Sequence, residues 1–150
     1  MNFPYFLVTH WDKNHVKSES IVPWIRFGVY NPNNHTKIVY PLGLVDSGSE
    51  ITFISHELGE ELGFDIRNTK IRGRADGVGG GSIEIFYHRV GLILDEGKEK
   101  YEFIDFIGFS YSDFPTSMPQ QTAILGTLGF FNHLNVSFKY PKVITIDQNS

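Results

Sequence analysis

Short apolar and aromatic runs, separated by turn-forming residues, constrain the fold of this chain more than any other feature. The clearest turns are at residues 31–34 (Asn-Pro-Asn-Asn), 95–98 (Asp-Glu-Gly-Lys) and 140–142 (Tyr-Pro-Lys). Proline presets the backbone of a turn, glycine permits positive φ, and Asn and Asp bond to their own backbone. The runs between the turns are rich in β-branched and aromatic residues, which favour strands. The pattern therefore predicts a mainly β fold organised as hairpins.

The apolar runs themselves give the expected elements. Strands are predicted over residues 4–9, 21–30, 37–45, 70–74, 82–94, 101–109, 136–140 and 143–146. Only two segments have helical character. The first follows Ser55, which can cap a helix with Glu57 in its first turn and Gly63 at its end. The second is a short segment over 127–133.

Length and composition restrict the class of protein. The 150 residues, 41% of them hydrophobic and 20% charged, suit one domain over residues 1–150. A net charge of −4 argues against a nucleic-acid partner, because such proteins need a positive field. No apolar run approaches the roughly 18 residues of a membrane helix, so we expect no membrane partner. The absence of cysteine favours a reducing compartment, and we expect the cytoplasm.

Several familiar site chemistries find no support in the sequence. The histidines, at positions 10, 15, 35, 56, 88 and 133, have no metal-ligand spacing. Neither Ser47 nor Ser49 stands in the Gly-x-Ser-x-Gly pattern of serine hydrolases. The glycines at 77–81 match neither a phosphate-binding loop nor a dinucleotide fingerprint. We therefore expect no metal and no cofactor.

One acidic residue, Asp46, lies where an ionised side chain is energetically unfavourable. An apolar run ends at Asp46, is followed at once by Ser47 and Gly48, and the chain becomes apolar again at 51–54. A carboxylate at the end of a buried strand is unfavourable unless something holds it or uses it. Asp-Ser-Gly is also a common surface turn. A surface turn does not need apolar segments on both sides, so the setting favours a functional site.

Three segments occur in a specific order along the chain: 44–49 (LVDSGS), 77–81 (GVGGG) and 123–126 (AILG). Together they resemble the retropepsin-like aspartic proteases, a single-domain family that includes the retroviral proteases. The resemblance covers residues 42–133, with extra chain before Ile21 and between 95 and 121. It implies an all-β acid-protease fold, a closed barrel with one or two short helices and a flap hairpin. The AILG segment is expected to pack beneath the loop that carries Asp46.

The resemblance implies that Asp46, Ser47 and Gly48 are catalytic. Peptide hydrolysis by carboxylates needs one acid and one base at the same water, and two close carboxylates meet this need by sharing a proton. The chain has no second Asp-Ser/Thr-Gly, since Asp76-Gly77 and the turn at 95–97 lack the hydroxyl residue. The family solves this with a homodimer, which places one motif from each copy on the twofold axis.

In such a dimer Ser47 bonds across the interface, Gly48 allows a close crossing, and the chain ends interleave between subunits. Substrate lies extended between the flap and the catalytic loop, with its main chain bonded like an added strand. Ser49 is expected to donate a hydrogen bond to Asp46, and Val78 to contact substrate at the flap tip. The implied substrate-binding residues are Ser49, Gly77, Val78, Gly79, Gly80 and Ile124.

The sequence thus predicts an aspartic endopeptidase that acts as a homodimer on extended peptide or protein substrates. Water is activated between Asp46 of the two subunits. One alternative is a module of the same fold that binds peptides or proteins without cutting them. Another is an unrelated small β barrel with a chance Asp-Ser-Gly.

Overall fold

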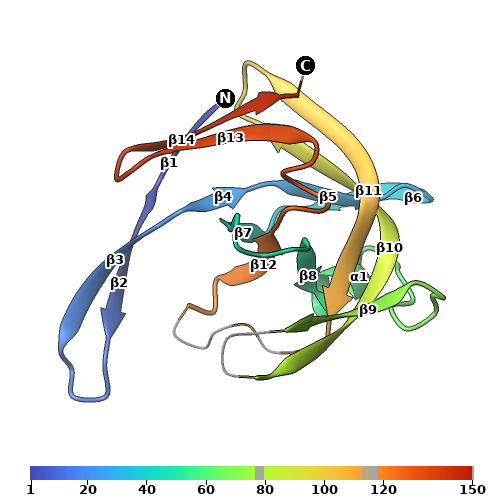
Figure 1. The fold of residues 1–150 in the computed structure, drawn as a ribbon, viewed down its shortest axis with the longest axis horizontal. Coiled ribbons are helices and arrows are strands. Elements are labelled where there is room, and N and C mark those ends of the chain that lie inside the picture. Colours follow the sequence, from blue (N-terminus) through green and yellow to red (C-terminus); the bar gives the residue numbers. More distant parts are fainter. Residues whose placement is uncertain (77–79, 113, 115–117, 150) are drawn as a thin grey trace.

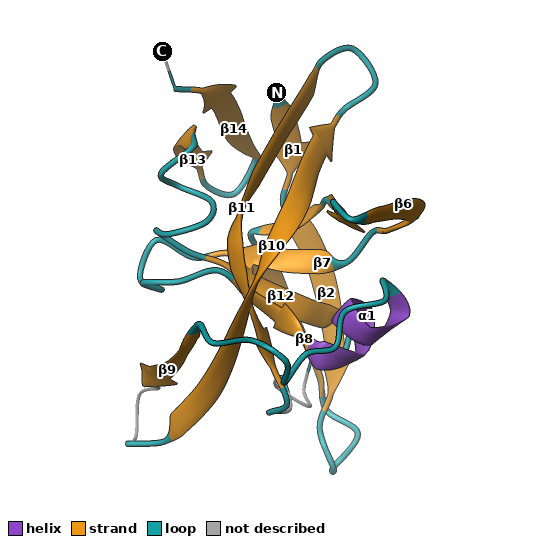
Figure 2. Cartoon of the chain, turned by 90° about the vertical axis from the view of Figure 1, so that its right-hand side faces the viewer, coloured by secondary structure: helices purple, strands orange, loops and turns teal. Residues whose placement is uncertain are grey.

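The computed structural model describes residues 1–76, 80–112, 114 and 118–149. Strands make up 59% of the chain and helix only 4%, which confirms the mainly β prediction (Figure 1). The single α-helix of the described residues, α1 (His56–Glu61), lies at one side of the sheet (Figure 2). The turn-separated runs therefore do form strands, as their composition predicts.

A nine-stranded sheet forms the body of the molecule. Its strands are β4 (Trp24–Arg26), β5 (Gly28–Asn31), β6 (Asn34–Val39), β7 (Leu42–Val45), β8 (Phe53–Ser55), β9 (Arg72–Asp76), β10 (Ser82–Asp95), β11 (Lys100–Ser110) and β12 (Gln121–Leu125). The order is β4-β7-β12-β8-β11-β10-β5-β6, with β9 paired to β10. The sheet curls into a half-barrel around a core that includes Phe27, Phe109 and Phe130. In the described residues its end strands, β4 and β6, are not paired with each other, so the expected barrel is only half closed.

A smaller sheet joins the two ends of the chain. It has the order β1-β14-β13, with β1 (Asn2–Pro4), β13 (Leu134–Lys139) and β14 (Val143–Gln148). The amino group of Met1 donates to the Ile146 carbonyl at 2.8 Å. Both edges of β14 are paired within one protomer, so β14 cannot accept a strand from a partner. The prediction that the ends interleave between subunits is therefore wrong for this strand.

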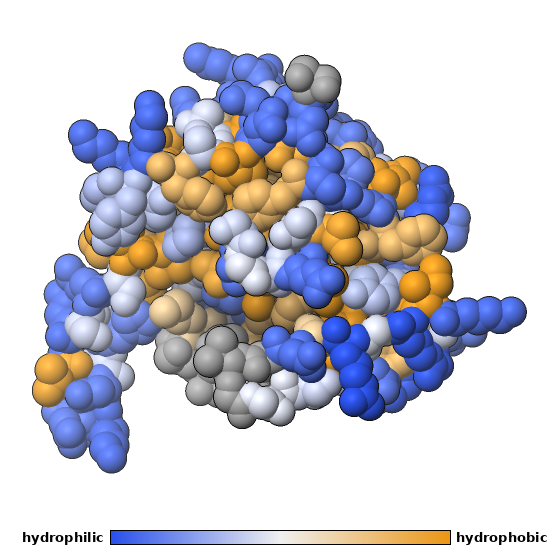
Figure 3. Space-filling view, in the orientation of Figure 1, coloured by the Kyte–Doolittle hydropathy of each residue, from blue (hydrophilic) through white to orange (hydrophobic). Residues whose placement is uncertain are grey.

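The third sheet is a hairpin of β2 (Phe6–Trp11) and β3 (Lys17–Val22) that stands away from the body (Figures 1 and 3). Val8 and Val22 face the body and pack with Trp24. The opposite face exposes Leu7 (64%) and Trp11 (66%). This alternation is the period of two expected for a strand pair with one buried face.

Two expected elements differ from the structure. The strand expected over 21–30 is divided among β3, β4 and β5, because Pro23, which has no N–H to donate, separates the first two. The helix expected over 127–133 is a series of turns instead. Gly129 has a φ of +92° there, which a right-handed helix does not allow.

The helix expected after Ser55 is present, with Glu57 in its first turn. Its end is as predicted, since Gly63 follows the last turn with a φ of +86° and its N–H donates to the Glu60 carbonyl at 3.0 Å. Ser55 occupies the N-cap position, but its side chain makes no capping hydrogen bond. The helix therefore starts without the side-chain cap that the sequence predicts.

Candidate active site

Asp46 follows directly on β7, an almost fully buried strand. Parallel pairing with β12 places Leu44 beside Ile124 and Val45 beside Leu125. The backbone N–H of Asp46 continues this ladder and donates to the Leu125 carbonyl at 3.0 Å. The position of Asp46 is therefore fixed by the sheet, while its side chain is only partly buried.

The loop after Asp46 closes on itself. Asp46 Oδ1 accepts a hydrogen bond of 2.9 Å from the Gly48 N–H, and the Asp46 carbonyl accepts one of 3.1 Å from the Ser49 N–H. The Ser49 hydroxyl donates to the Ile51 carbonyl at 2.8 Å. The prediction that Ser49 donates to Asp46 is wrong in this structure, because its hydroxyl already binds this backbone carbonyl. Ser47 and Gly48 are exposed at the tip.

A main-chain brace holds this loop against the chain that follows β12. The Thr127 N–H donates to the Ser49 carbonyl, and the Leu128 N–H donates to the Glu50 carbonyl, both at 2.9 Å. The Thr52 N–H donates to the Leu128 carbonyl at the same distance. The segment at 123–126 and its continuation therefore pack against the loop that carries Asp46, as predicted.

Thr52 is a site residue that the sequence analysis did not identify. It is 1% exposed, and its Oγ1 accepts a hydrogen bond of 2.9 Å from the Gly126 N–H. The sequence signal for Thr52 was a single hydroxyl residue inside the apolar run 51–54, because a buried hydroxyl needs a hydrogen-bond partner. A Cβ on Gly126 would lie 2.2 Å from the Ile51 carbonyl oxygen, so this approach requires glycine.

A small cleft separates the loop from strand β9. Its volume is about 250 Å³, and it is lined by Gly48, Ser49, Glu50, Ile51, Arg74, Ala75 and Asp76. Strands β9 and β10 pair as an antiparallel hairpin, Asp76 opposite Ser82. Gly80 is exposed near its tip, whereas Gly77, Val78 and Gly79 lie outside the described residues. Ile124 is partly buried in β12, between β7 and β8.

An acid–histidine pair ties the turns at 127–133 to the sheet. Asp105 in β11 accepts a hydrogen bond from His133 Nε2 at 2.6 Å, and its other oxygen accepts one from the Phe106 N–H at 2.7 Å. Burial raises the pKa of Asp105, but the bonds from His133, Phe106 and Asn132 outweigh burial and hold this pKa below its usual range. The ring of His133 also stacks on Phe103, with 4.2 Å between centroids.

This pair predicts a pH-dependent stability. A carboxyl whose folded pKa is lowered contributes stability above its unfolded pKa of about 3.9 and loses it as pH falls through the folded value. We expect Asp105→Asn to lower the free energy of unfolding by about 1–2 kcal/mol near pH 6. The difference from wild type should shrink towards pH 3. Urea unfolding at several pH values measures it, with the exposed Asp65→Asn as control; a difference that does not change with pH contradicts the role.

Two further properties of the described residues bear on function. No three His, Asp or Glu side chains among them lie close enough together to hold a metal ion. Within the same part of the chain, no helix has both the length and the apolar character needed to cross a membrane.

Comparison with known proteins finds a match in structure but not in sequence. No protein-family model matches the chain, and neither does any curated protein sequence. The fold is similar to the crystal structure of a retropepsin-like aspartic protease from Rickettsia conorii, with a TM-score of 0.53. The match covers 93% of this chain and 98% of that one, at 15% sequence identity. This likeness is one of fold, and it confirms the predicted retropepsin-like fold class.

Proposed function

We propose that this protein is an aspartic endopeptidase that acts as a homodimer. The observation that carries the proposal is the setting of Asp46. Main-chain bonds fix this residue at the end of a buried strand, while its loop tip, Ser47 and Gly48, is exposed. Among the described residues Asp46 forms no salt bridge, and its side chain accepts one hydrogen bond, at Oδ1. The other carboxylate oxygen is therefore available to a water or to a second Asp46.

In the proposed dimer, Asp46 and its symmetry mate share one proton at the twofold axis. The ionised carboxylate takes a proton from water, and the resulting hydroxide attacks the peptide carbonyl carbon. The protonated carboxyl gives its proton to the carbonyl oxygen, which yields a neutral tetrahedral diol. The carboxyl that took the proton from water then gives it to the amide nitrogen, while the other carboxylate takes the proton of one diol hydroxyl. The C–N bond breaks, the amine and the carboxylic acid are released, and the pair again holds one proton.

The cleft between the Asp46 loop and β9 is the proposed substrate site. β9 pairs only with β10 among the described residues, so its other edge can bond an extended peptide as an added strand. Ser49 lines this cleft and Gly80 is near the tip of the β9–β10 hairpin, whereas Ile124 lies in β12 and does not line the cleft. We retain the sequence-based expectation that Gly77, Val78 and Gly79 also contact the substrate.

Cleavage of a denatured protein at mildly acidic pH tests the proposal. We expect fragments to form and pepstatin to prevent their formation, because this inhibitor occupies the site of a paired-aspartate enzyme. The mass in solution should be that of two chains under the same conditions. A dimer that binds peptides without cutting them would identify a binding module of the same fold, and a permanent monomer would contradict the shared site.

A further inference from the structure

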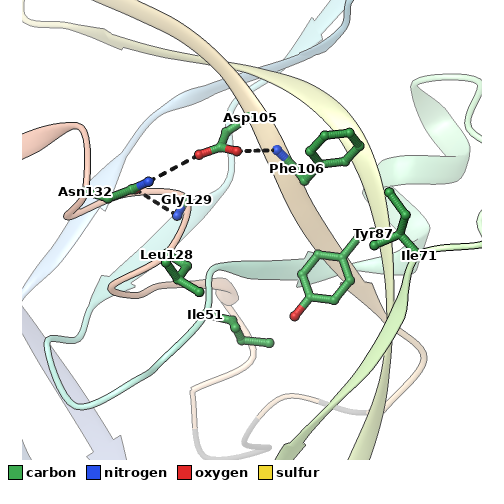
Figure 4. Close-up of a pocket in the computed structure, with 8 residues that line it drawn as sticks. All are labelled: Ile51, Ile71, Tyr87, Asp105, Phe106, Leu128, Gly129 and Asn132. Atoms are coloured by element: carbon green, nitrogen blue, oxygen red, sulfur yellow. Dashed lines mark hydrogen bonds between the residues drawn. The ribbon is translucent and has the colours of Figure 1, made fainter.

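A second hollow, outside the cleft, is open and apolar. It lies between the base of the β9–β10 hairpin and the turns after β12, with a volume of about 320 Å³. Figure 4 shows Ile51 and Leu128 on one side, across from Tyr87 and Ile71. The complete lining is Ile51, Ile71, Tyr87, Asp105, Phe106, Leu128, Gly129 and Asn132.

The apolar lining is exposed to water to an unusual degree. Ile71 is 48% exposed, Phe106 50% and Leu128 54%. Single exposed apolar side chains are ordinary, but three around one hollow mark a place where an apolar group is bound. A volume near the lower end of the roughly 300–1,000 Å³ typical of ligand pockets suits one large side chain.

The polar side chains Asn132 and Asp105 of the hollow are already engaged in hydrogen bonds. Asn132 Oδ1 accepts a hydrogen bond from the Gly129 N–H at 2.9 Å, and its Nδ2 donates to Asp105 at 3.5 Å. Asp105 is held by His133 as well. Burial, and then the charge of Glu50, raise the pKa of Tyr87, so its hydroxyl stays neutral at physiological pH. The site is therefore suited to an uncharged apolar group.

The hollow adjoins the proposed substrate cleft. Ile51 lines both cavities, and Ile71, which lines the hollow, directly precedes β9, whose residues Arg74 to Asp76 line the cleft. A peptide that lies along β9 in the cleft would reach the hollow where its chain leaves the cleft. The occupant that this proximity favours is a residue of the substrate chain itself.

We propose that this hollow binds a large apolar side chain of the substrate, at a fixed position away from the scissile bond. This inference rests on the proposed function and specifies its substrate class: extended peptides with Leu, Ile, Met or Phe at that outlying position. Ile71 and Phe106 would then be determinants of specificity. They would select among substrates without contacting the reacting atoms.

The test begins with a peptide library, which identifies a cleaved sequence and any preference for apolar residues at a position away from the scissile bond. Two peptides are then made that differ only at that position, one with Leu and one with Asp. We expect wild type to prefer the Leu peptide by about tenfold in kcat/KM. Phe106→Asp should abolish the preference. Ile104→Asp is the matched control, because Ile104 is exposed on the same strand but does not line the hollow, and it should keep the preference.

The outcomes separate this inference from the proposed function. Cleavage without an outlying apolar preference, or a preference that persists in Phe106→Asp, overturns the inference alone. Dissociation of the dimer in Phe106→Asp but not in Ile104→Asp would assign the hollow to a second copy of the chain, and would also overturn it. If wild type cuts no peptide in the library, both the function and the inference fail.

Discussion

Asp46→Asn is expected to lower kcat/KM for cleavage of a denatured protein by about 10²–10⁴-fold or more. The amide can neither take a proton from water nor give one to the carbonyl oxygen, so both proton transfers are lost at once. The rate of fragment formation at mildly acidic pH, followed by electrophoresis or mass spectrometry, measures the effect. Activity that survives the substitution would exclude Asp46 from the chemistry.

The fold should survive this substitution. An asparagine Oδ1 can still accept the Gly48 N–H, which is the bond that Asp46 makes in the protomer. Thermal unfolding and mass in solution should therefore match wild type. Asp12→Asn is the matched control: it removes the same charge in the β2–β3 hairpin, and the new amide oxygen can keep the bonds from the Asn14 and Val16 N–H groups.

Gly126→Ala is expected to lower the free energy of unfolding by about 3 kcal/mol, and to reduce activity with it. The new Cβ would lie 2.2 Å from the Ile51 carbonyl oxygen and 2.7 Å from that of Ser49. Both atoms belong to the backbone of the Asp46 loop, which can yield only by moving away from β12. Urea unfolding measures the stability, and cleavage of a denatured protein measures the activity.

Gly81→Ala is the control for added side-chain volume. A Cβ at Gly81 meets no atom of the described residues within 4 Å, so we expect a change in unfolding free energy of no more than about 0.5 kcal/mol. If Gly126→Ala is as stable as Gly81→Ala, the close approach of the two segments does not exist in solution. Loss of stability with full activity would show that the loop position is not needed for function.

The sequence predicted the strand-rich fold and the contact between the segment at 123–126 and the Asp46 loop. Alternating apolar runs and turn residues are local signals, and they place most strands correctly. Local signals do not predict the structure where contacts between residues distant in the sequence determine the conformation. The segment at 127–133 has helical composition, but Gly129 has a φ of +92° there and the Leu128 carbonyl accepts the Thr52 N–H, so turns replace the helix. Thr52 and the Asp105–His133 pair also depend on partners that are 28 or more residues away.

The expected role of Ser49 failed for a related reason. The spacing in Asp46-Ser47-Gly48-Ser49 allowed its hydroxyl to reach the carboxylate, but the Ile51 carbonyl is available two residues on and is bound instead. Spacing along a chain limits which atoms can meet, and it does not choose among acceptors within reach. The meeting of two Asp46 side chains depends on a second molecule, so it remains a proposal.

The brace around Asp46 also bears on how such chains can diverge. Three of its bonds join only backbone N–H and C=O groups, those from Thr127, Leu128 and Thr52. Every amino acid except proline carries both groups, so the side chains at 127 and 128 can be replaced while the loop geometry is inherited unchanged. The sequences of related proteins can therefore diverge until no sequence similarity is detectable while the fold is kept, provided that the glycine at 126 is retained.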